Sequence, residues 1–470
     1  MSLSRRSFLG AAAGALLVPA AGWRGRRNLS GIPSRARPTP TPAQLAWQQD
    51  ELALFVHFGI NTFTDREWGD GTEDPALFDP ARLDARQWAR TAREAGFRAM
   101  VLTAKHHDGF CLWPTRTTSH SVRSSPWRGA SGDVVRDFVD ACRAEGLKAG
   151  LYCSPWDRNA PFYGDSPRYN DLYAEQLREL LTWYGPIHEV WFDGANGEGP
   201  AGRRQAYDWP RFWDVVRRRQ PGAVIFSDAG PDVRWIGNEA GSAGDPNWST
   251  VDPSVVPFPG ATGPGVVEHL QHGDPEGSVW RPGETDVSIR PGWFHHASED
   301  ARVRSSEELV ELYFTSVGRN SKLLLNVPPT AAGLLHDVDV AALRGMRRAL
   351  DALFASSAPV GARVRTPAGP RAETLELDLG QPVTLGIVDL REDISAGQSV
   401  VRYRFEGHDG RAWRTLSEGQ TIGCRKLDRF APVALERVRV TTEDGWGPPR
   451  PVAVGLHPGR RGATEAPRPP

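Results

Sequence analysis

The chain has 470 residues, a length that suits one large domain with one or two small ones better than a single small core. Hydrophobic residues make up 39% of it and charged residues 24%, which is typical of a folded globular chain and excludes general disorder. The chain has 56 Lys and Arg residues and 57 Asp and Glu residues, so its formal net charge is −1. No extended basic surface for nucleic acid is therefore expected.

The first residues have the pattern of an export signal. Arg5 and Arg6 precede Phe8 and Leu9, and a short run rich in Ala and Gly follows. A charged start, a short apolar stretch and small residues at a cleavage site are typical of a signal peptide, and this apolar run is too short to span a membrane comfortably. The arginine pair resembles the twin-arginine export signal. We expect residues 1–21 to be such a signal and the mature protein, without a membrane span, to be periplasmic or secreted.

From residue 52 onward, short apolar runs alternate with helical patterns. Asp133 begins one predicted helix, while Asp84 with Gln87 and Ser305 with Glu308 have the spacing of capping boxes at two others. The runs that we expect to form strands are 54–56, 99–102, 147–152, 189–192, 224–226 and 323–325.

Repeated strand–helix units predict a parallel sheet covered by helices, either a doubly wound sheet or a barrel. No Gly-x-Gly-x-x-Gly motif follows the first strand, which disfavours a dinucleotide-binding sheet. His57, His106, Tyr152 and Asp193 instead lie at the carboxyl ends of successive predicted strands, where barrel enzymes carry their active sites. We therefore predict an α/β fold with a (β/α)8-type barrel over residues 43–357.

Beyond about residue 360 the helical signals end and the pattern becomes the alternation of half-buried strands. Segments 374–379, 400–405 and 433–440 alternate apolar and polar residues. We predict a smaller antiparallel β-sandwich over residues 358–457, followed by a disordered tail at 458–470. Residues 22–42, which lack an apolar pattern, are expected to be a linker.

Carboxylates beside tryptophans are the first candidates for chemistry. Asp193 follows Trp191 and Phe192 at the end of a predicted strand, although a strand-end Asp can also be a cap or an ion-pair partner. Glu239, in a segment with Gly and Trp, and Glu67, next to Trp68, are equal rivals for a second acid. Two carboxylates among tryptophans suggest glycoside hydrolysis, in which one attacks the anomeric carbon and the other transfers protons.

The histidines raise the possibility of a metal site. His57, His106, His107 and Asp108 could hold zinc, but a barrel hydrolase usually brings ligands as His-x-His on one face of a strand, and no such pair is present. Hydrogen bonding to sugar hydroxyls fits these histidines better, so we expect no metal and no cofactor. The four cysteines have no zinc-type spacing and are too few for a disulfide scaffold, which favours free thiols.

Seven strings of the sequence together resemble the α-L-fucosidases of glycoside hydrolase family 29, and the likeness runs from about residue 43 to 457. The strings are His57-Phe58-Gly59, Glu67-Trp68, Lys105-His106-His107-Asp108-Gly109-Phe110, Ser154-Pro155-Trp156-Asp157, Trp191-Phe192-Asp193-Gly194, Ser288-Ile289-Arg290-Pro291-Gly292-Trp293-Phe294 and residues 323–328.

The resemblance implies a retaining exo-glycosidase with a barrel and a C-terminal β-sandwich, acting on a fucosylated oligosaccharide or glycoconjugate. It makes Asp193 the nucleophile. The segment 235–239 resembles the branch selective for α-1,3/1,4-linked fucose, in which the acid/base matches Glu239. The positions that the family uses to hold fucose carry over onto His57, Glu67, Trp68, His106, His107, Tyr152, Trp191 and Trp293.

Three other functions stay open from the sequence. A pocket that is merely hydrophobic around the sugar's C6 methyl rejects an added hydroxyl weakly, so a retaining exo-glycosidase for L-galactose is the first alternative. A non-catalytic glycan-binding protein on the same barrel is the second, although the presence of both Asp193 and Glu239 argues against it. A metal-dependent hydrolase is the third.

Overall fold

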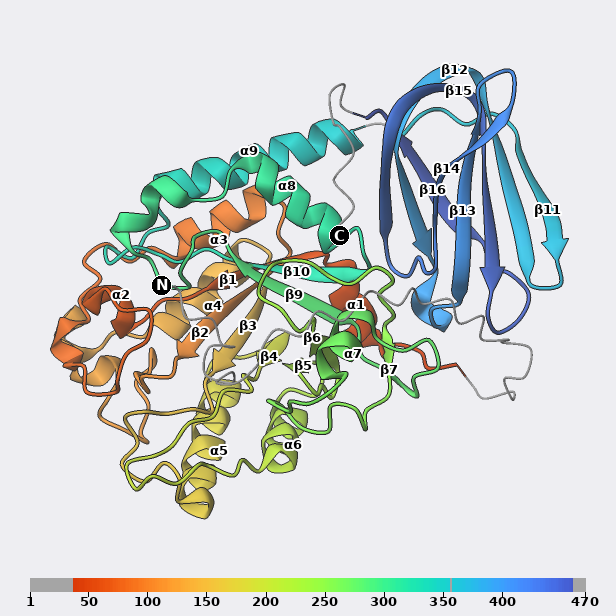
Figure 1. Ribbon diagram of the computed structural model, residues 1–470. Helices are drawn as coiled ribbons and strands as arrows, with labels where there is room; N and C mark the ends of the chain where they lie inside the picture. Colours follow the sequence, from red (N-terminus) through yellow and green to blue (C-terminus); the bar gives the residue numbers. More distant parts are fainter. Residues whose placement is uncertain (1–36, 356, 460–470) are drawn as a thin grey trace, which may run out of the picture.

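The computed structural model of the chain describes residues 37–355 and 357–459. A barrel and a β-sandwich lie side by side in it (Figure 1). The predicted signal at 1–21, most of the predicted linker and nearly all of the predicted tail lie outside the described residues. None of the helices in the part that is described has the length and apolarity needed to cross a membrane.

Eight parallel strands close into a barrel in the order β1-β10-β9-β6-β5-β4-β3-β2, which confirms the predicted fold class. The strands of the barrel are β1 (Leu52–Val56), β2 (Ala99–Lys105), β3 (Lys148–Cys153), β4 (Glu189–Trp191), β5 (Val224–Ser227), β6 (Val233–Trp235), β9 (Gly283–Ser288) and β10 (Ser321–Asn326).

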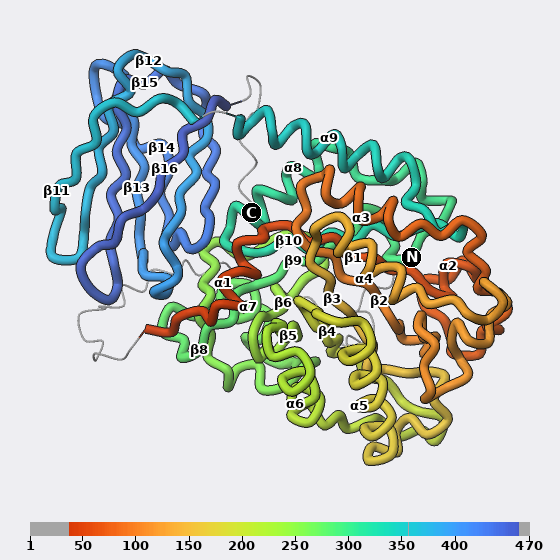
Figure 2. The backbone as a smooth tube through the Cα atoms, turned by 180° about the vertical axis from the view of Figure 1, so that it is seen from behind, coloured from red at the N-terminus to blue at the C-terminus, as the bar shows by residue number. Residues whose placement is uncertain are grey.

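Helices surround the barrel on its outside, as Figure 2 shows from behind. The longer helices are α3 (Ala85–Glu94), α4 (Val134–Ala144), α5 (Ser166–Trp183), α6 (Trp209–Arg219), α8 (Ser306–Thr315) and α9 (Asp337–Phe354). The short elements are α1 (Pro42–Gln49), α2 (Ile60–Thr64), α7 (Val266–His272), the paired strands β7 (Thr250–Val251) and β8 (Val279–Trp280), and 3-10 turns at Pro75–Leu77, Val122–Ser124, Trp127–Ala130, Ala297–Arg302 and Ile394–Ala396.

Capping residues set where several helices begin. The predicted capping box at Ser305 and Glu308 is present at the start of α8. The one predicted at Asp84 is wrong in part, because Asp84 accepts the backbone N–H of Gln87 but the Gln87 side chain does not reach back. That side chain instead exchanges two hydrogen bonds with the backbone of Leu335, far along the chain. A tertiary contact therefore replaces half of a local motif.

Two strands of the barrel, β6 and β9, have no counterpart in the predicted set. β6 has only three residues, and β9 carries Glu284, Thr285 and Asp286, all fully buried. Because alternate residues of a strand share one face, Glu284 and Asp286 point the same way. They accept hydrogen bonds from Trp191 on β4 and Trp235 on β6, respectively. β9 was not predicted because it lacks an apolar run, and the side chains of Glu284 and Asp286 lie inside the barrel.

Helix α1 and its Trp47 line the amino-terminal end of the barrel. The helix begins at Pro42 behind a capping box formed by Thr41 and Gln44. Trp47 is completely buried, and its Nε1 donates to Glu189 Oε2 at 2.8 Å. Lys322 lies 4.5 Å from the centre of the Trp47 ring and 3.1 Å from the same carboxylate oxygen. The lysine charge and the indole thus both bind one oxygen of a carboxylate that is almost free of solvent contact.

The C-terminal strands form an antiparallel six-stranded sheet that folds into the β-sandwich drawn in blue in Figure 1. Its two longest strands, β12 and β15, change register where they bend, and leucine and valine side chains fill a core separate from that of the barrel. The strands are β11 (Arg363–Gly369), β12 (Ala372–Glu392), β13 (Val400–His408), β14 (Trp413–Gly419), β15 (Lys426–Asp444) and β16 (Val452–His457).

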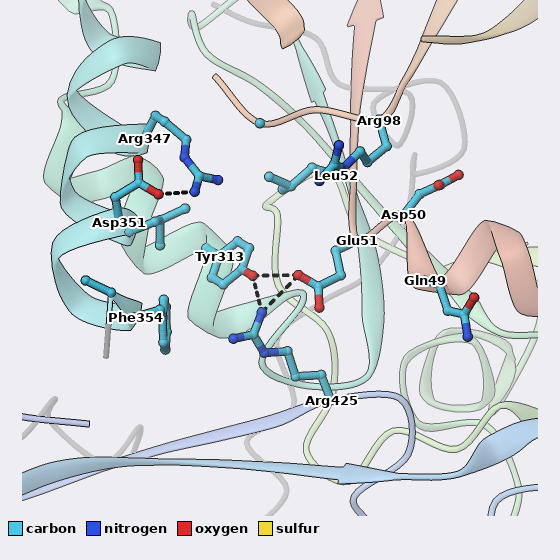
Figure 3. Close-up of a pocket in the computed structure, with 13 residues that line it drawn as sticks. Gln49, Asp50, Glu51, Leu52, Arg98, Tyr313, Arg347, Asp351, Phe354 and Arg425 are labelled. Atoms are coloured by element: carbon cyan, nitrogen blue, oxygen red, sulfur yellow. Dashed lines mark hydrogen bonds and ion pairs between the residues drawn. The ribbon is translucent and has the colours of Figure 1, made fainter. Parts of the chain in front are cut away.

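The sandwich contacts the barrel at its amino-terminal end. Glu51, immediately before β1, accepts hydrogen bonds from Tyr313 (2.7 Å) and from Arg425 of the sandwich (2.9 Å), as Figure 3 shows. Arg425 also pairs with Asp389 of β12 at 2.8 Å. Glu51, Tyr313 and Arg425 line a cavity of about 300 Å³, to which the sandwich contributes Arg425. Since the active sites of such barrels lie at the carboxyl ends of the strands, the sandwich is attached at the opposite end.

The four cysteines are free thiols. Cys111, Cys142 and Cys153 are buried, and Cys424 is partly buried at the junction with α1. Burial raises the pKa of the Cys153 thiol to about 11, which keeps it protonated and unreactive at neutral pH.

Candidate active site

Polar and aromatic side chains gather at the carboxyl end of the barrel. Nine predicted site residues form one cluster that is connected by hydrogen bonds or ring contacts, although they come from loops and strands that are far apart in the sequence. The nine are His57, Glu67, Trp68, His106, His107, Tyr152, Trp191, Asp193 and Trp293.

Asp193 is the carboxylate at the centre of this cluster. It lies two residues after the end of β4 and is 3% exposed. The Tyr152 hydroxyl donates to its Oδ2 at 3.0 Å, and the backbone N–H of Ala195 donates to its Oδ1 at 2.8 Å. His107 Nε2 lies 3.9 Å from Oδ2. Each carboxylate oxygen is therefore held by a donor, so the side chain has a defined orientation.

The histidines form a row beside Asp193. The rings of His106 and His107 lie 4.1 Å apart, and His57 follows at 5.6 Å from His106. His57 Nδ1 is 2.9 Å from Asn326 Oδ1 at the end of β10, and His107 Nδ1 is 2.7 Å from Ser154 Oγ. A partner that fixes one ring nitrogen of a histidine also fixes the position of the other. Recognition of sugar hydroxyls requires nitrogens at such fixed positions.

Asp108, which directly follows His107 in the sequence, is buried next to the row. Burial, with a contribution from the charge of Glu73, outweighs the 2.7 Å hydrogen bond from the Phe110 backbone and raises the pKa of Asp108 to about 7. His106 Nδ1 lies 4.0 Å from its carboxylate. Among the described residues, no group of three or more His, Cys, Asp or Glu side chains is arranged to hold a metal ion.

Glu67 holds the loop that carries Trp293. Its carboxylate accepts the backbone N–H groups of Trp293 at 2.6 Å and Phe294 at 3.3 Å, and it pairs with His296 at 3.2 Å. The hydrogen bond to Glu67 outweighs burial and, together with Asp65, raises the pKa of His296 to about 9. Trp293 then lies with its ring 5.0 Å from His57. The sequence motifs identified Glu67 and Trp293, but not His296, the histidine that pairs with Glu67.

Trp191 is held in place by a carboxyl group and an aromatic ring inside the barrel. Its Nε1 donates to Glu284 Oε1 at 3.0 Å, and its ring stacks on Phe226 at 4.1 Å. Burial and the neighbouring charge of Glu189 raise the pKa of Glu284 well above its usual range, while Lys322 opposes that shift. The Trp191 indole thus donates to a buried carboxyl whose charged form is disfavoured, and Lys322, 4.0 Å from that carboxyl, is the cation that offsets this effect.

Glu239 lies on a different segment, the loop that follows β6, and is half-buried. Within β6, Trp235 donates to Asp286 at 2.7 Å. Asp228, at the end of β5, accepts the backbone N–H of Gly260 at 3.1 Å. The sequence reasoning missed Asp228 and Asp286. Asp228 closely follows the predicted strand 224–226, and a search for polar residues at the ends of predicted strands would have identified it. Asp286 lies in β9, a polar strand that the hydrophobicity pattern does not predict.

A cavity of about 650 Å³ opens beside Asp193. Trp68, His107 and Asp193 line it, with Asp228 and Trp235 from the neighbouring strand ends. The far part of its wall comes from the segment 258–270, and its lining residues in the described chain all lie between positions 68 and 270. The sandwich thus contributes nothing to this wall. A cavity of this size, with aromatic walls and a few convergent polar groups, fits a sugar and part of what is bonded to it.

Comparison with known proteins agrees with this geometry. The family model described as Alpha-L-fucosidase matches residues 37–352. "Alpha-L-fucosidase 1" of Arabidopsis thaliana is 40% identical over 429 residues, covering 85% of this chain and 83% of the relative. Among solved structures, a glycoside hydrolase 29 family member from a rumen bacterium is 39% identical with a TM-score of 0.83, covering 91% of this chain and 79% of that one.

A second similar structure is described as a complex with fucose. The Ruminococcus gnavus GH29 fucosidase in complex with fucose is 29% identical to this chain, with a TM-score of 0.81, and covers 93% of this chain and 98% of that one. The family model spans about two thirds of the chain, and both the sequence and the fold of the relatives extend over most of it. The chain therefore belongs to glycoside hydrolase family 29 and is an α-L-fucosidase.

Proposed function

We propose that this enzyme is a retaining, exo-acting α-L-fucosidase that removes terminal α-1,3/1,4-linked fucose from an oligosaccharide or glycoconjugate, with Asp193 as nucleophile and Glu239 as acid/base. The observation that carries the proposal is the setting of Asp193. It is a buried carboxylate, oriented by Tyr152 and by the Ala195 N–H, at the carboxyl end of a barrel strand and on the wall of a cavity.

The reaction proceeds in two displacements. Asp193 attacks C1 of the fucose and forms an ester bond, while the bond from C1 to the departing oxygen breaks and Glu239 gives that oxygen a proton. Glu239, now a carboxylate, takes a proton from water, and the water oxygen attacks C1. The ester bond breaks and the Asp193 carboxylate is restored. Because C1 is inverted twice, the released fucose has the α configuration of the substrate.

The other residues of the cluster hold the sugar. His57, His106 and His107 offer ring nitrogens to its hydroxyls, and Tyr152 keeps Asp193 in place. Trp191 and Trp293 provide apolar surface for the C6 methyl group. Trp68, whose ring lies 5.8 Å from that of His107, extends this surface along the cavity, and Glu67 sets the position of Trp293.

The two carboxylates are distinguished by the stereochemistry of chemical rescue. With dinitrophenyl α-L-fucoside, whose leaving group needs no proton, Glu239→Ala should still form the ester with Asp193, and added azide should then give α-fucosyl azide by double inversion. Asp193→Ala cannot form the ester, so any azide product should be β-fucosyl azide from a single inversion. Without azide, losing the nucleophile should cost several powers of ten in rate. Proton NMR of the products decides, and swapped configurations would mean that the two roles are reversed.

The linkage preference rests on the segment 235–239 and has its own test. Release of fucose that is α-1,3/1,4-linked to N-acetylglucosamine, beside a neighbouring galactose, should be faster than release of α-1,2-linked fucose. Comparable kcat/KM values on both glycans would contradict the preference without touching the nucleophile assignment. We also propose that the protein is exported, with residues 1–21 as a twin-arginine signal.

A further inference from the structure

Two exposed apolar side chains lie on the wall of the active-site cavity. Phe258 is 53% exposed and Val267 is 42% exposed, and both line the cavity that contains Asp193. Single exposed apolar residues are common on protein surfaces, but two that border the same functional cavity mark a surface for contact. Leu270, which is buried, continues the same wall from α7.

The backbone that carries Phe258 is built as a tight turn. Ala261 N donates to Phe258 O at 3.1 Å, which closes a turn with Pro259 and Gly260 at its two central positions. Gly260 has φ +82°. A type II turn requires a positive φ at its third residue and favours proline at its second, and this segment has both. The turn therefore holds Phe258 in one place, although the side chain itself is open to solvent.

This turn is seated directly against the residue that follows Asp193. A Cβ atom on Gly194 would lie 2.6 Å from Gly260 N and 2.8 Å from Gly260 Cα, and a Cβ on Gly260 would lie 2.5 Å from Gly194 O. Only two glycines allow these backbones to touch. Asp228 adds the 3.1 Å hydrogen bond to Gly260 N. The position of Phe258 is thus tied to that of Asp193 through one glycine contact and one carboxylate.

The chemical nature of the group that binds against Phe258 and Val267 can be deduced from the substrate that the cavity must hold. The bond to be cut lies at Asp193, so the part of the cavity that extends from Asp193 to the segment 258–270 receives whatever is bonded to the fucose. The lining of the cavity as a whole combines apolar groups with hydrogen-bonding ones, including Arg204 and Gln205. A pyranose ring, with a C–H face and a rim of hydroxyls, matches such a lining, whereas an alkyl chain would leave the polar groups facing hydrocarbon.

We infer that Phe258 and Val267 form a platform for the C–H face of the sugar unit attached to the fucose, and that this platform determines which glycans the enzyme accepts. The inference rests on the proposed function, because it assumes that Asp193 marks the point of cleavage. Phe258 is a specificity residue in this scheme, without contact to the fucose itself.

The test compares a substrate that has this second sugar with one that lacks it. Phe258→Ala should lower kcat/KM about ten-fold, equivalent to about 1.4 kcal/mol, on a trisaccharide with α-1,3/1,4-linked fucose. The same variant should leave hydrolysis of α-L-fucosyl fluoride, followed with a fluoride electrode, unchanged. Phe258→Tyr keeps the aromatic face and should restore activity on the trisaccharide. Leu77→Ala is the matched control, because Leu77 is 50% exposed but does not line the cavity.

Four outcomes would overturn the inference. An equal loss on both substrates would place Phe258 in fucose binding or folding, and no loss on the trisaccharide would mean that nothing rests on the platform. A greater loss on octyl α-L-fucoside than on the trisaccharide would identify an apolar occupant instead of a sugar. If the wild-type enzyme released fluoride but Asp193→Ala did so equally well, the assignment of the nucleophile would fail, and the platform with it.

Discussion

Replacing Asp108 with asparagine should make the protein more stable at neutral and alkaline pH, and this gain should disappear in acid. Asp108 is 2% exposed and its pKa is raised to about 7, whereas an unfolded aspartate titrates near 3.9. Between about pH 4 and pH 7 the folded state therefore holds a proton that the unfolded state has lost. Because the unfolded state then binds fewer protons, the free energy of unfolding falls as the pH rises through this range.

The size of the effect follows from the pKa difference. About three pH units at 1.36 kcal/mol each give a loss of about 4 kcal/mol in the wild type. The asparagine side chain of the Asp108→Asn variant would carry no charge at any pH and could still accept the Phe110 N–H through its own oxygen. The variant should therefore match the wild type near pH 4 and exceed its stability by up to about 4 kcal/mol at pH 8. For a chain of this length that is a difference of about 4 °C in Tm.

Thermal unfolding of both proteins at pH 4.5 and pH 8 measures this difference and cancels the other titrating groups. Asp70→Asn is a control of opposite sign, because the hydrogen bonds from Thr72 lower the pKa of exposed Asp70. An acid whose pKa is lowered in the folded state contributes stability above its unfolded pKa. The free energy of unfolding of Asp70→Asn should therefore fall relative to that of the wild type as the pH rises. A Tm difference for Asp108→Asn that stays constant between the two pH values would refute the reasoning.

Three further predictions concern the junction, the export signal and the absence of a metal requirement. Arg425→Met should destabilise the protein by about 1–3 kcal/mol in thermal or urea unfolding, because it leaves the carboxylates of Glu51 and Asp389 with the half-exposed Arg391 in place of a buried cation; a Tm equal to that of the wild type would show that the pair contributes nothing. Changing Arg5 and Arg6 together to lysine should retain the protein in the cytoplasm, as fractionation would show, and undiminished export would contradict a twin-arginine signal. EDTA should leave fucose release unchanged, since the sequence offers no His-x-His pair and the described residues no group of three suitable ligands; activity that is lost on chelation and restored by zinc would show that this interpretation is wrong.

Local patterns in the sequence determined much of the architecture. Apolar runs in the sequence predicted β1 to β5 and β10. These strands are buried on both faces, so most of their residues are apolar and the run can be recognised without knowing which strands pair with it. Alternation marked the long strands of the sandwich, where one face meets the core and the other meets water. The end-of-strand position of Asp193 was predictable for the same reason, since it follows directly from where an apolar run stops.

Only the tertiary structure decided which buried polar groups could be tolerated, and where. Glu284 and Asp286 make β9 look unlike a core strand, yet Trp191 and Trp235, 93 and 51 residues away, donate to them inside the closed barrel. Glu67 was visible as a motif, but its partners Trp293 and His296 lie more than 220 residues further along the chain. A buried carboxylate is stable only when donors surround it. Those donors are brought together by closure of the barrel, and no local pattern in the sequence records them.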